Sequence, residues 1–348
     1  MPRRPENNPR GYQSPEEQQI PFESHMIPCQ DGVQIHSWLL LRTSNGRNVI
    51  PNSPTIVFFH GNAGNIGLRL PNAIQMLNRL NANILLVEYR GYGNSDSVTP
   101  TEAGLRLDAE AALCFISQHP SIDNSRIFLF GRSLGGAVAF HLAEYAQRQH
   151  ISVAGVMVEN TFLSISHMVD HLMPFLKPIK VFVLKIGWNS AKIVPDLTMP
   201  ILYLAGSGDQ LVPHPHMLKL AKLSLRSVLV QMHVIENGTH NETWLQGGRL
   251  YWDKMRVFMV QAVEHAPRIS NVRVNATSTV ATADGSDTAD TAAVDFGTTG
   301  TAVAAECAAA SNGIPIMPSD FLDMAQEATR GSSSSTGGPD TATAKKDI

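Results

Sequence analysis

The stretch from Phe128 to Gly136 places a Gly-x-Ser-x-Gly turn directly between an apolar strand and a helical run. This order is typical of a nucleophile elbow, in which a tight turn lifts a serine hydroxyl clear of a β-sheet. The two glycines carry no side chains that could collide within the turn. The helix that follows directs its positive N-terminal end at the serine. We therefore predict Ser133 as a catalytic nucleophile; the alternative is a Gly/Ser turn without chemistry.

Apolar strands and helical patterns alternate through most of the chain. Continuous apolar strands separated by helices predict a mostly parallel central sheet with helices on both faces. In such α/β sheets the chemistry lies in the crevice at the carboxyl ends of the strands. The expected strands are Phe22–Ile27, Val33–Leu41, Thr55–Phe59, Ile84–Tyr89, Ile127–Phe130, Val153–Val158, Ile201–Leu204 and Leu229–Ile235, and the expected helices are Leu68–Leu80, Thr101–His119, Leu134–Gln147 and Gly247–His265.

The folded domain is expected to occupy residues 21–266, with segments of different composition on either side. Residues 1–20 are polar and lack an apolar run, so we predict a disordered N-terminus. Residues 267–348 are rich in Ala, Thr, Ser, Gly and Asp. Such a segment cannot bury enough apolar surface to offset its ordering entropy, so we predict a disordered low-complexity tail. Within the domain, the proline-containing residues 162–196 predict a short cap segment over the site, or two ordinary core helices.

A catalytic serine needs partners, because a base must take the hydroxyl proton and a carboxylate must orient the base. In a hydrolase of this strand and helix order, the three residues follow along the chain as Ser, acid, His. Asp209 lies in a glycine-rich loop just past the apolar strand 201–204, and His240 lies in a loop after the last strand. We predict Asp209 as the acid and His240 as the base. The alternatives are a turn or helix-capping aspartate and a solvated loop histidine.

The developing negative charge of an acyl-transfer reaction needs two backbone N–H donors, an oxyanion hole. One donor is expected from Leu134, directly after the nucleophile. The other is expected from Asn62 in the loop 60–65, which is rich in glycine and asparagine and follows the strand 55–59. Gly-rich turns are common, so the prediction depends on the loop and the serine turn occurring together.

Glu159 is a rival for the role of the triad acid, because it closes the strand 153–158. We predict instead that Glu159 pairs with Arg132, next to the nucleophile, as structural support. The hypothesis is wrong if a Glu159→Gln variant loses as much activity as an Asp209→Asn variant while its folding stays intact.

Composition and motifs limit the cofactors and partners. The formal net charge of −3 gives no basic footprint, so nucleic acid is not an expected partner. No glycine motif for a dinucleotide or phosphate occurs, and His214-Pro215-His216 has no Cys or carboxylate cluster beside it, so we expect neither cofactor nor metal. Three widely spaced cysteines indicate a reducing compartment. Since the N-terminus also lacks an apolar run, the chain reads as soluble and cytoplasmic.

Further motifs accompany the serine turn, and the set is His60–Gly67, Tyr89–Gly93, Phe130–Gly136, Glu159–Phe162 and Gly238–Trp244. Together they resemble the family of α/β-hydrolase domain-containing protein 13 and its bud-emergence-type relatives, over about Pro21 to His265. The resemblance implies an α/β-hydrolase fold and the same nucleophile, acid and base. Animal members of the family begin with a hydrophobic anchor, so the resemblance also implies membrane association. Residues 1–20 of this sequence contain no such apolar run. Relatives include protein depalmitoylases, and some are classed as serine peptidases.

The expected function is therefore a serine hydrolase that cleaves an ester or thioester, a protein S-acyl group included, through an acyl-enzyme intermediate. The apolar segment 162–193 favours a small-molecule or lipid-like acyl substrate, or an acylated protein, and contact with a membrane. Two alternatives stay open: a serine peptidase on the same fold and a non-catalytic interaction scaffold. The lack of a large substrate-selecting domain argues against long peptides, and the intact order of Ser, Asp and His argues against a scaffold.

Overall fold

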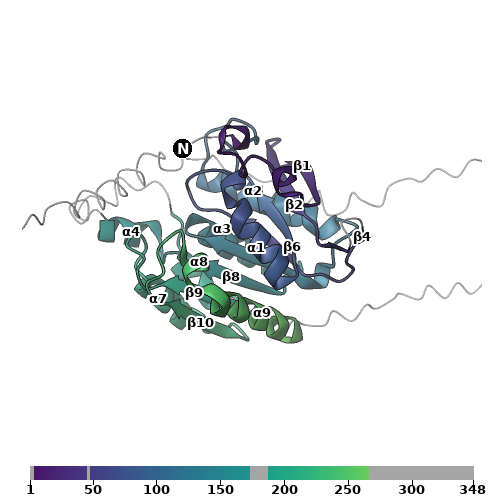
Figure 1. The fold of residues 1–348 in the computed structure, drawn as a ribbon. Helices are drawn as coiled ribbons and strands as arrows, with labels where there is room; N and C mark the ends of the chain where they lie inside the picture. Colours follow the sequence, from purple (N-terminus) through teal and green to yellow (C-terminus); the bar gives the residue numbers. More distant parts are fainter. Residues whose placement is uncertain (1–3, 45–47, 173–186, 266–348) are drawn as a thin grey trace, which may run out of the picture. The chain divides into compact units, whose positions relative to one another are not determined.

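The computed structural model describes residues 4–44, 48–172 and 187–265 (Figure 1). Its central element is an eight-stranded sheet with the strand order β1-β2-β6-β5-β7-β8-β9-β10. The pairs β1 with β2 and β2 with β6 are antiparallel, and the other neighbouring pairs of this sheet are parallel. The strands are β1 (Phe22–Pro28), β2 (Gln34–Leu40), β5 (Thr55–Phe59), β6 (Asn83–Val87), β7 (Ile127–Arg132), β8 (Gly155–Glu159), β9 (Ile201–Gly206) and β10 (Val230–Ile235), while β3 (Thr43–Ser44) and β4 (Asn48–Val49) form a separate pair.

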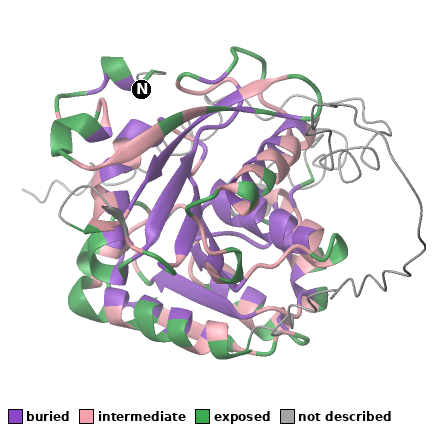
Figure 2. Ribbon diagram, turned by 90° about the vertical axis from the view of Figure 1, so that its right-hand side faces the viewer, coloured by how far each residue is buried: buried purple, intermediate pink, exposed green. Residues whose placement is uncertain are grey.

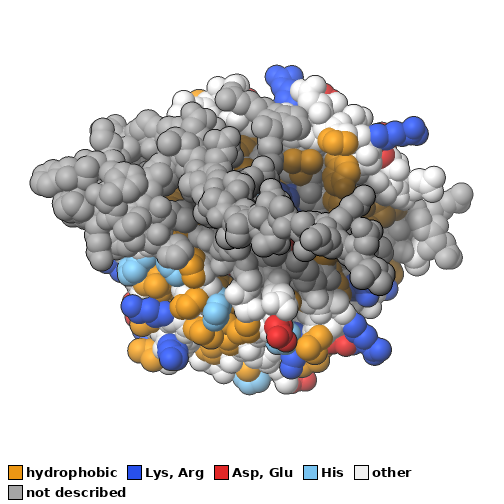
Figure 3. Space-filling model, turned by 60° about the vertical axis from the view of Figure 1, so that its left-hand side comes forward, with side chains coloured by type: hydrophobic (Ala, Val, Ile, Leu, Met, Phe, Trp, Pro, Cys, Tyr) orange, Lys and Arg blue, Asp and Glu red, His pale blue; other side chains and the backbone are white. Residues whose placement is uncertain are grey.

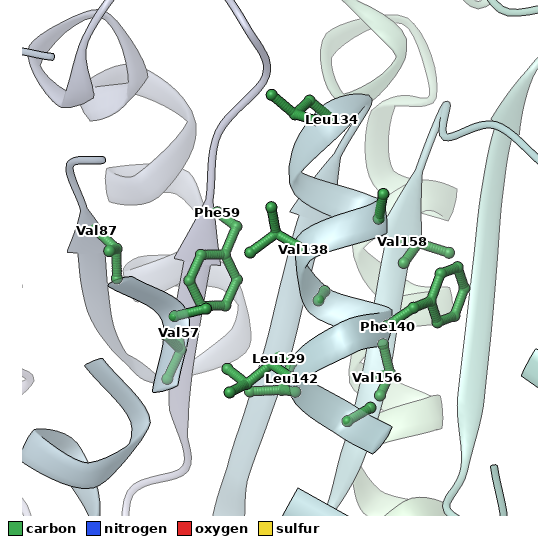
Figure 4. Packing of buried hydrophobic residues seen from close by; sticks show 14 of the residues in the cluster. Val57, Phe59, Val87, Leu129, Leu134, Val138, Phe140, Leu142, Val156 and Val158 are labelled. Carbon is green, nitrogen blue, oxygen red and sulfur yellow. The ribbon is translucent and has the colours of Figure 1, made fainter. Parts of the chain in front are cut away.

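Helices cover both faces of the sheet, as the alternating sequence pattern predicts. Because side chains alternate along a strand, Phe58 packs in the layer of α1 and α9, whereas Phe59 packs in the layer of α2 and α3. Figure 4 shows the second layer, where Val138 of α3 lies near Phe59. Each fully buried large apolar side chain stabilises the fold by about 1.5–3 kcal/mol. The long helices of these two layers are α1 (Leu70–Leu80), α2 (Glu102–Gln118), α3 (Leu134–Arg148) and α9 (Gly248–His265).

The inner strands are buried along their whole length, and exposed residues gather on the outer sides of helices and in loops (Figure 2). The last helix, α9, packs on the sheet through Trp252, Met255, Phe258 and Met259, which are all buried. On the face drawn in Figure 3, Lys and Arg side chains are scattered rather than gathered into one patch. Within the described residues, no helix has both the length and the apolar character that a bilayer span requires.

Two strands end two residues later than the sequence predicts. β7 continues through Gly131 to Arg132, and β9 continues to Gly206. These glycines indicate turns in the sequence, but Gly131 is paired with residues of β5 and β8, and Gly206 is paired with Ile235 of β10. The short helices α7 (Pro215–Leu223) and α8 (Thr243–Gln246) are not among the helices that the sequence analysis predicts.

The prediction of a disordered N-terminus is wrong for residues 4–20. Two single-turn helices, Pro5–Asn7 and Pro15–Gln18, lie in this stretch. Asn8 is buried, and its carboxamide exchanges two hydrogen bonds of 2.8 and 3.0 Å with the carboxamide of Asn65 in the loop after β5. A reciprocal asparagine pair joins segments far apart in sequence, so local composition cannot reveal it.

The predicted cap lies partly outside the described residues. Its described parts include α4 (Ile165–Leu172) and α6 (Ser190–Ile193). Phe162, Leu163 and Trp188 are buried in the same apolar layer as α2 and α3, so these parts pack as core. Residues 173–186 and the predicted tail over 267–348 lie outside the described residues.

The parallel pairing sets the carboxyl ends of five strands along one edge of the sheet. The strands are β5, β7, β8, β9 and β10, and the residues predicted for the site lie at these ends or in the segments that directly follow them. The level ends are seen in the pairing of Phe59 with Gly131, of Arg132 with Glu159, of Glu159 with Leu204 and of Ile235 with Gly206.

Candidate active site

Ser133 lies in a sharp turn between β7 and α3. Its backbone has φ 54° and ψ −120°, a strained conformation for a residue with a side chain. The turn is tight: a Cβ atom at Gly131 would lie 2.1 Å from the carbonyl oxygen of Gly135, and one at Gly135 would lie 2.1 Å from that of Phe59. Only glycine fits at these two positions. The predicted elbow geometry is therefore present, with Ser133 at its apex.

Asp209 and His240 are hydrogen-bonded to each other. Oδ1 of Asp209 accepts the backbone N–H groups of Leu211 and Val212, each at 2.9 Å. Its other oxygen, Oδ2, lies 2.7 Å from Nδ1 of His240. An ionised carboxylate only accepts hydrogen bonds, so this contact favours the tautomer with the proton on Nδ1 and a free lone pair on Nε2. That is the orientation a general base requires.

The residues that end β8 contact both the serine turn and the histidine loop. The carbonyl oxygen of Glu159 accepts the N–H of Ser133 at 3.0 Å, and Oγ1 of Thr161 donates to the carbonyl oxygen of Ser133 at 2.7 Å. Between them, the side chain of Asn160 donates to the carbonyl oxygen of His240 at 3.0 Å. Three consecutive residues thus contact both the turn of Ser133 and the loop of His240. Reasoning from the sequence assigned no role to Asn160 or Thr161.

The loop after β5 lies beside the serine. A methyl group built on Gly61 would lie 3.5 Å from Cβ of Ser133. Asn62 is buried, and its carbonyl oxygen accepts the hydroxyl of Tyr92 at 2.8 Å. Leu134 opens α3, where the first backbone N–H groups have no acceptor within the helix. The two predicted oxyanion donors therefore come from segments that flank Ser133.

A buried histidine–glutamate pair supports this loop, and the sequence reasoning missed it. Nε2 of His60 lies 3.1 Å from Oε1 of Glu88, and both side chains are fully buried. Nδ1 of His60 lies 2.7 Å from the carbonyl oxygen of Gly61, and Oε2 of Glu88 accepts the N–H of Ile66 at 3.0 Å. With both ring nitrogens engaged, His60 holds the Gly61–Asn62 peptide in one orientation. The sequence signal was present, since Glu88 directly follows the apolar residues of β6, where a buried carboxylate needs a partner.

Glu159, the rival acid, is engaged on the other side of the sheet from α3. Its Oε1 accepts Nε–H of Arg132 at 2.5 Å, and its Oε2 accepts the hydroxyl of Tyr251 at 2.5 Å. Arg132 also donates to Asn72 of α1 at 2.7 Å. Burial, followed by the charge of Glu159, raises the pKa of Tyr251 well above its usual range, so this hydroxyl stays a donor. Both carboxylate oxygens of Glu159 thus face residues of the α1 and α9 layer.

One group of metal-ligating side chains comes together among the described residues, away from the serine turn. Nε2 of His25 and Nε2 of His119 lie 2.9 and 3.0 Å from the same carboxylate oxygen of Glu23. The N–H of Ser121 donates to Nδ1 of His119, which leaves the imidazole proton on Nε2. A metal would need that nitrogen unprotonated, so the three side chains form a hydrogen-bonded group on β1 and after α2.

Proteins with similar sequences identify the family. The model of a family described as serine aminopeptidase, S33, matches residues 51–196. The α/β-hydrolase domain-containing protein WAV2 of Arabidopsis thaliana is 37% identical over 243 residues, covering 66% of this chain and 76% of the relative. Protein bem46 of Schizosaccharomyces pombe is 34% identical over 246 residues, covering 70% of this chain and 79% of the relative.

Solved structures share the fold at lower sequence identity. A Pyrococcus furiosus esterase superposes with a TM-score of 0.58 at 16% identity, covering 72% of this chain and 94% of that chain. An esterase of Pyrobaculum calidifontis superposes with a TM-score of 0.54 at 15% identity, covering 70% and 85%. The predicted α/β-hydrolase fold is confirmed, and family and fold together support hydrolase activity. The chain belongs to the α/β-hydrolase family that includes WAV2 and bem46.

Proposed function

We propose that this protein is a serine hydrolase that cleaves esters or thioesters of apolar acyl chains, with Ser133, His240 and Asp209 as its triad. One observation carries the proposal. A strained serine between β7 and α3 and a hydrogen-bonded Asp–His pair are tied to the same three residues at the end of β8. A non-catalytic Gly/Ser turn, the alternative interpretation, would not account for the nearby histidine that Asp209 orients.

In the proposed reaction, Oγ of Ser133 attacks the acyl carbonyl carbon while Nε2 of His240 takes the hydroxyl proton. The oxyanion accepts hydrogen bonds from the backbone N–H groups of Leu134 and Asn62. His240 then protonates the departing alcohol or thiol, and the acyl group stays on Ser133. A water molecule gives a proton to His240 and attacks the acyl-enzyme, which releases the carboxylic acid and restores Ser133. Asp209 orients the imidazole and stabilises its charged form throughout.

Apolar residues beside the serine turn favour an acyl chain as the substrate group. Phe162 and Leu163 directly follow Thr161, and both are buried. The sulfur of Met217 accepts the N–H of Thr161 at 3.3 Å, so a further apolar side chain reaches the same place. These side chains pack as part of the core, but they make the surroundings of the serine turn apolar, and an apolar site binds acyl chains through the area it removes from water. An S-acylated protein presents the same chemistry as a small thioester.

A peptidase is the second candidate, because the matching family model is described as a serine aminopeptidase. The triad chemistry is common to both, so substrate choice decides between them. The solved neighbours named as esterases support the first candidate at the level of the fold.

A comparison of substrates tests the proposal. The purified protein and its Ser133→Ala variant are assayed with p-nitrophenyl acetate, p-nitrophenyl palmitate, a palmitoyl thioester and an aminoacyl p-nitroanilide. We expect turnover of the esters and the thioester, and a loss of about 10⁶-fold in kcat on removing the nucleophile. Turnover of the anilide alone would favour the peptidase, and turnover that survives in Ser133→Ala would contradict the assigned nucleophile.

A further inference from the structure

Asn160 follows β8 at the centre of the candidate site, and its carboxamide joins two loops. Its Oδ1 accepts the N–H of Gly206, at the point where β9 passes into the loop of Asp209, at 2.8 Å. Its Nδ2 lies 3.0 Å from the carbonyl oxygen of His240 and 3.2 Å from that of Thr239. The acid loop and the base loop therefore share one buried side chain.

The orientation of this carboxamide is fixed. Its oxygen faces a donor, the N–H of Gly206, and its nitrogen faces acceptors, which include Oγ1 of Thr243 at 3.0 Å. Only 1% of Asn160 is exposed. Its backbone has φ 48°, a left-handed conformation that asparagine tolerates better than most residues with side chains. Shape, hydrogen bonding and backbone conformation all select asparagine at this position.

Other contacts between the two loops do not replace this one. Gly208 donates its N–H to the carbonyl oxygen of Gly238 at 3.0 Å, and the backbone N–H of Asn237 donates to Oγ of Ser207 at 2.8 Å. These contacts lie before His240 in the chain. Asn160, in contrast, donates a hydrogen bond to the carbonyl oxygen of His240 itself. It therefore fixes the backbone position from which the imidazole projects.

We propose that Asn160 is a positioning residue that sets the spacing between Asp209 and His240, an inference that rests on the proposed hydrolase function. It acts through His240 and does not touch the substrate. A misplacement of a catalytic group by about 1 Å costs about 10²-fold in rate. Loss of the carboxamide N–H groups therefore lowers kcat and leaves substrate binding, and so KM, close to that of the wild type.

Two variants test the inference, and a third is the matched control. Asn160→Asp keeps the size, the acceptor for Gly206 and the left-handed backbone, but turns an oxygen toward the carbonyl of His240. Asn160→Gly removes the side chain without backbone strain. The control is Asn83→Asp, at a buried asparagine at the start of β6. There Nδ2 donates to Thr55 at 3.2 Å and Oδ1 accepts from Arg42 at 2.8 Å.

Kinetics and proton NMR are measured on all of these proteins in full length. We expect both Asn160 variants to lose about 10²-fold in kcat with KM nearly unchanged. We also expect the low-field resonance of the proton on Nδ1 of His240, assigned by its loss in Asp209→Ala, to move or disappear. The Asn83→Asp control should keep the wild-type kcat per folded molecule and the wild-type resonance.

The outcomes separate this inference from the proposed function. Folded Asn160 variants with wild-type kcat and resonance would overturn the inference, while Ser133-dependent turnover would leave the hydrolase assignment standing. A wild type without turnover would remove the hydrolase assignment, and an unchanged resonance in the variants would then still refute the role of Asn160. If both Asn160 variants fail to fold, the residue has a general structural role, and the positioning role is rejected.

Discussion

The guanidinium of Arg132 lies 2.5 Å from the carboxylate of Glu159, and both side chains are almost completely buried. Arg132 directly precedes the serine of the turn, and Glu159 pairs with it in the strand register. The ion pair therefore joins the end of β7 to the end of β8 beneath the site. Asp209, in contrast, accepts backbone hydrogen bonds from its own loop through one carboxylate oxygen and contacts Nδ1 of His240 through the other. The two acids thus stand in different environments that suit different roles.

The two acids can be told apart by substitution, because one change should lower kcat and the other should lower the free energy of unfolding. We expect Asp209→Asn to keep its fold and lose about 10⁴-fold in kcat, because the imidazole is then held in the wrong tautomer. We expect Glu159→Gln to lose about 3–5 kcal/mol in its free energy of unfolding, because a buried arginine loses its counter-charge. Kinetics and urea unfolding of both variants measure this. A folded Glu159→Gln with the kcat loss of Asp209→Asn would reassign the acid.

Gly135 should tolerate no side chain. A Cβ atom there would lie 2.1 Å from the carbonyl oxygen of Phe59 and 2.8 Å from that of His60, and backbone cannot rotate aside as a side chain can. We expect Gly135→Ala to lose about 3 kcal/mol or more of stability and to displace the serine turn, with a kcat loss of at least about 10²-fold. Thermal unfolding and kinetics check both effects.

Gly32→Ala is the control for this change. Gly32 has φ 84° and nothing within 4 Å of an added Cβ atom, so only the backbone strain of about 1–2 kcal/mol applies. Its kcat should equal that of the wild type. If the two alanine variants had the same stability and activity, the close approach of α3 to β5 would not be essential to the turn.

His36 should make the protein sensitive to mild acid. Burial lowers the pKa of His36 to about 4; the charge of Glu6 opposes this shift, and that of His25 adds to it. In the unfolded chain the pKa is about 6.5. The folded state therefore resists a proton that the unfolded state accepts, so the free energy of unfolding is highest above pH 6.5. It falls by up to about 1.4 kcal/mol per pH unit as the pH decreases toward 4.

His36→Gln removes this titration and retains a partner for Ser24, which lies 2.9 Å from Nε2 of His36. Between pH 7.5 and 5, we expect the wild type to lose about 2 kcal/mol more stability than the variant does. Urea unfolding at the two pH values gives this difference. Equal losses in the two proteins would mean that His36 takes up its proton equally well in the folded and unfolded states.

The parts of the site that depend on local sequence could be predicted. The serine turn is defined by glycines on either side of Ser133, and the strand Thr55–Phe59 was predicted at its observed ends because it is continuously apolar and bounded by polar residues. Asp209 and His240 follow from the order of strands and loops. The serine turn and the strand are each encoded within a few residues, whereas Asp209 and His240 are found from their place in the repeating order of strands and loops.

The parts that depend on residues distant in sequence could not be predicted. The carboxamide of Asn160 acquires its role from loops about 46 and 80 residues further along the chain. The buried carboxylate of Glu88 is explained by His60 and by the N–H of Ile66, which both belong to the segment after the neighbouring strand β5. The buried Asn8 is similar, because its partner Asn65 belongs to another segment. Polar side chains buried at strand ends are fixed by tertiary partners, and a single sequence does not show those partners.

Labelling with a fluorophosphonate probe tests the central claim most directly. The probe reacts with a serine whose hydroxyl is activated by a neighbouring base, and mass spectrometry of the digested protein identifies the labelled residue. We expect the wild type to be labelled at Ser133, the His240→Ala variant to be labelled far more slowly, and the folded Ser133→Ala variant not to be labelled. A well-folded wild type that takes up no probe, or label that persists in Ser133→Ala, would contradict the assignment of Ser133 as an activated nucleophile.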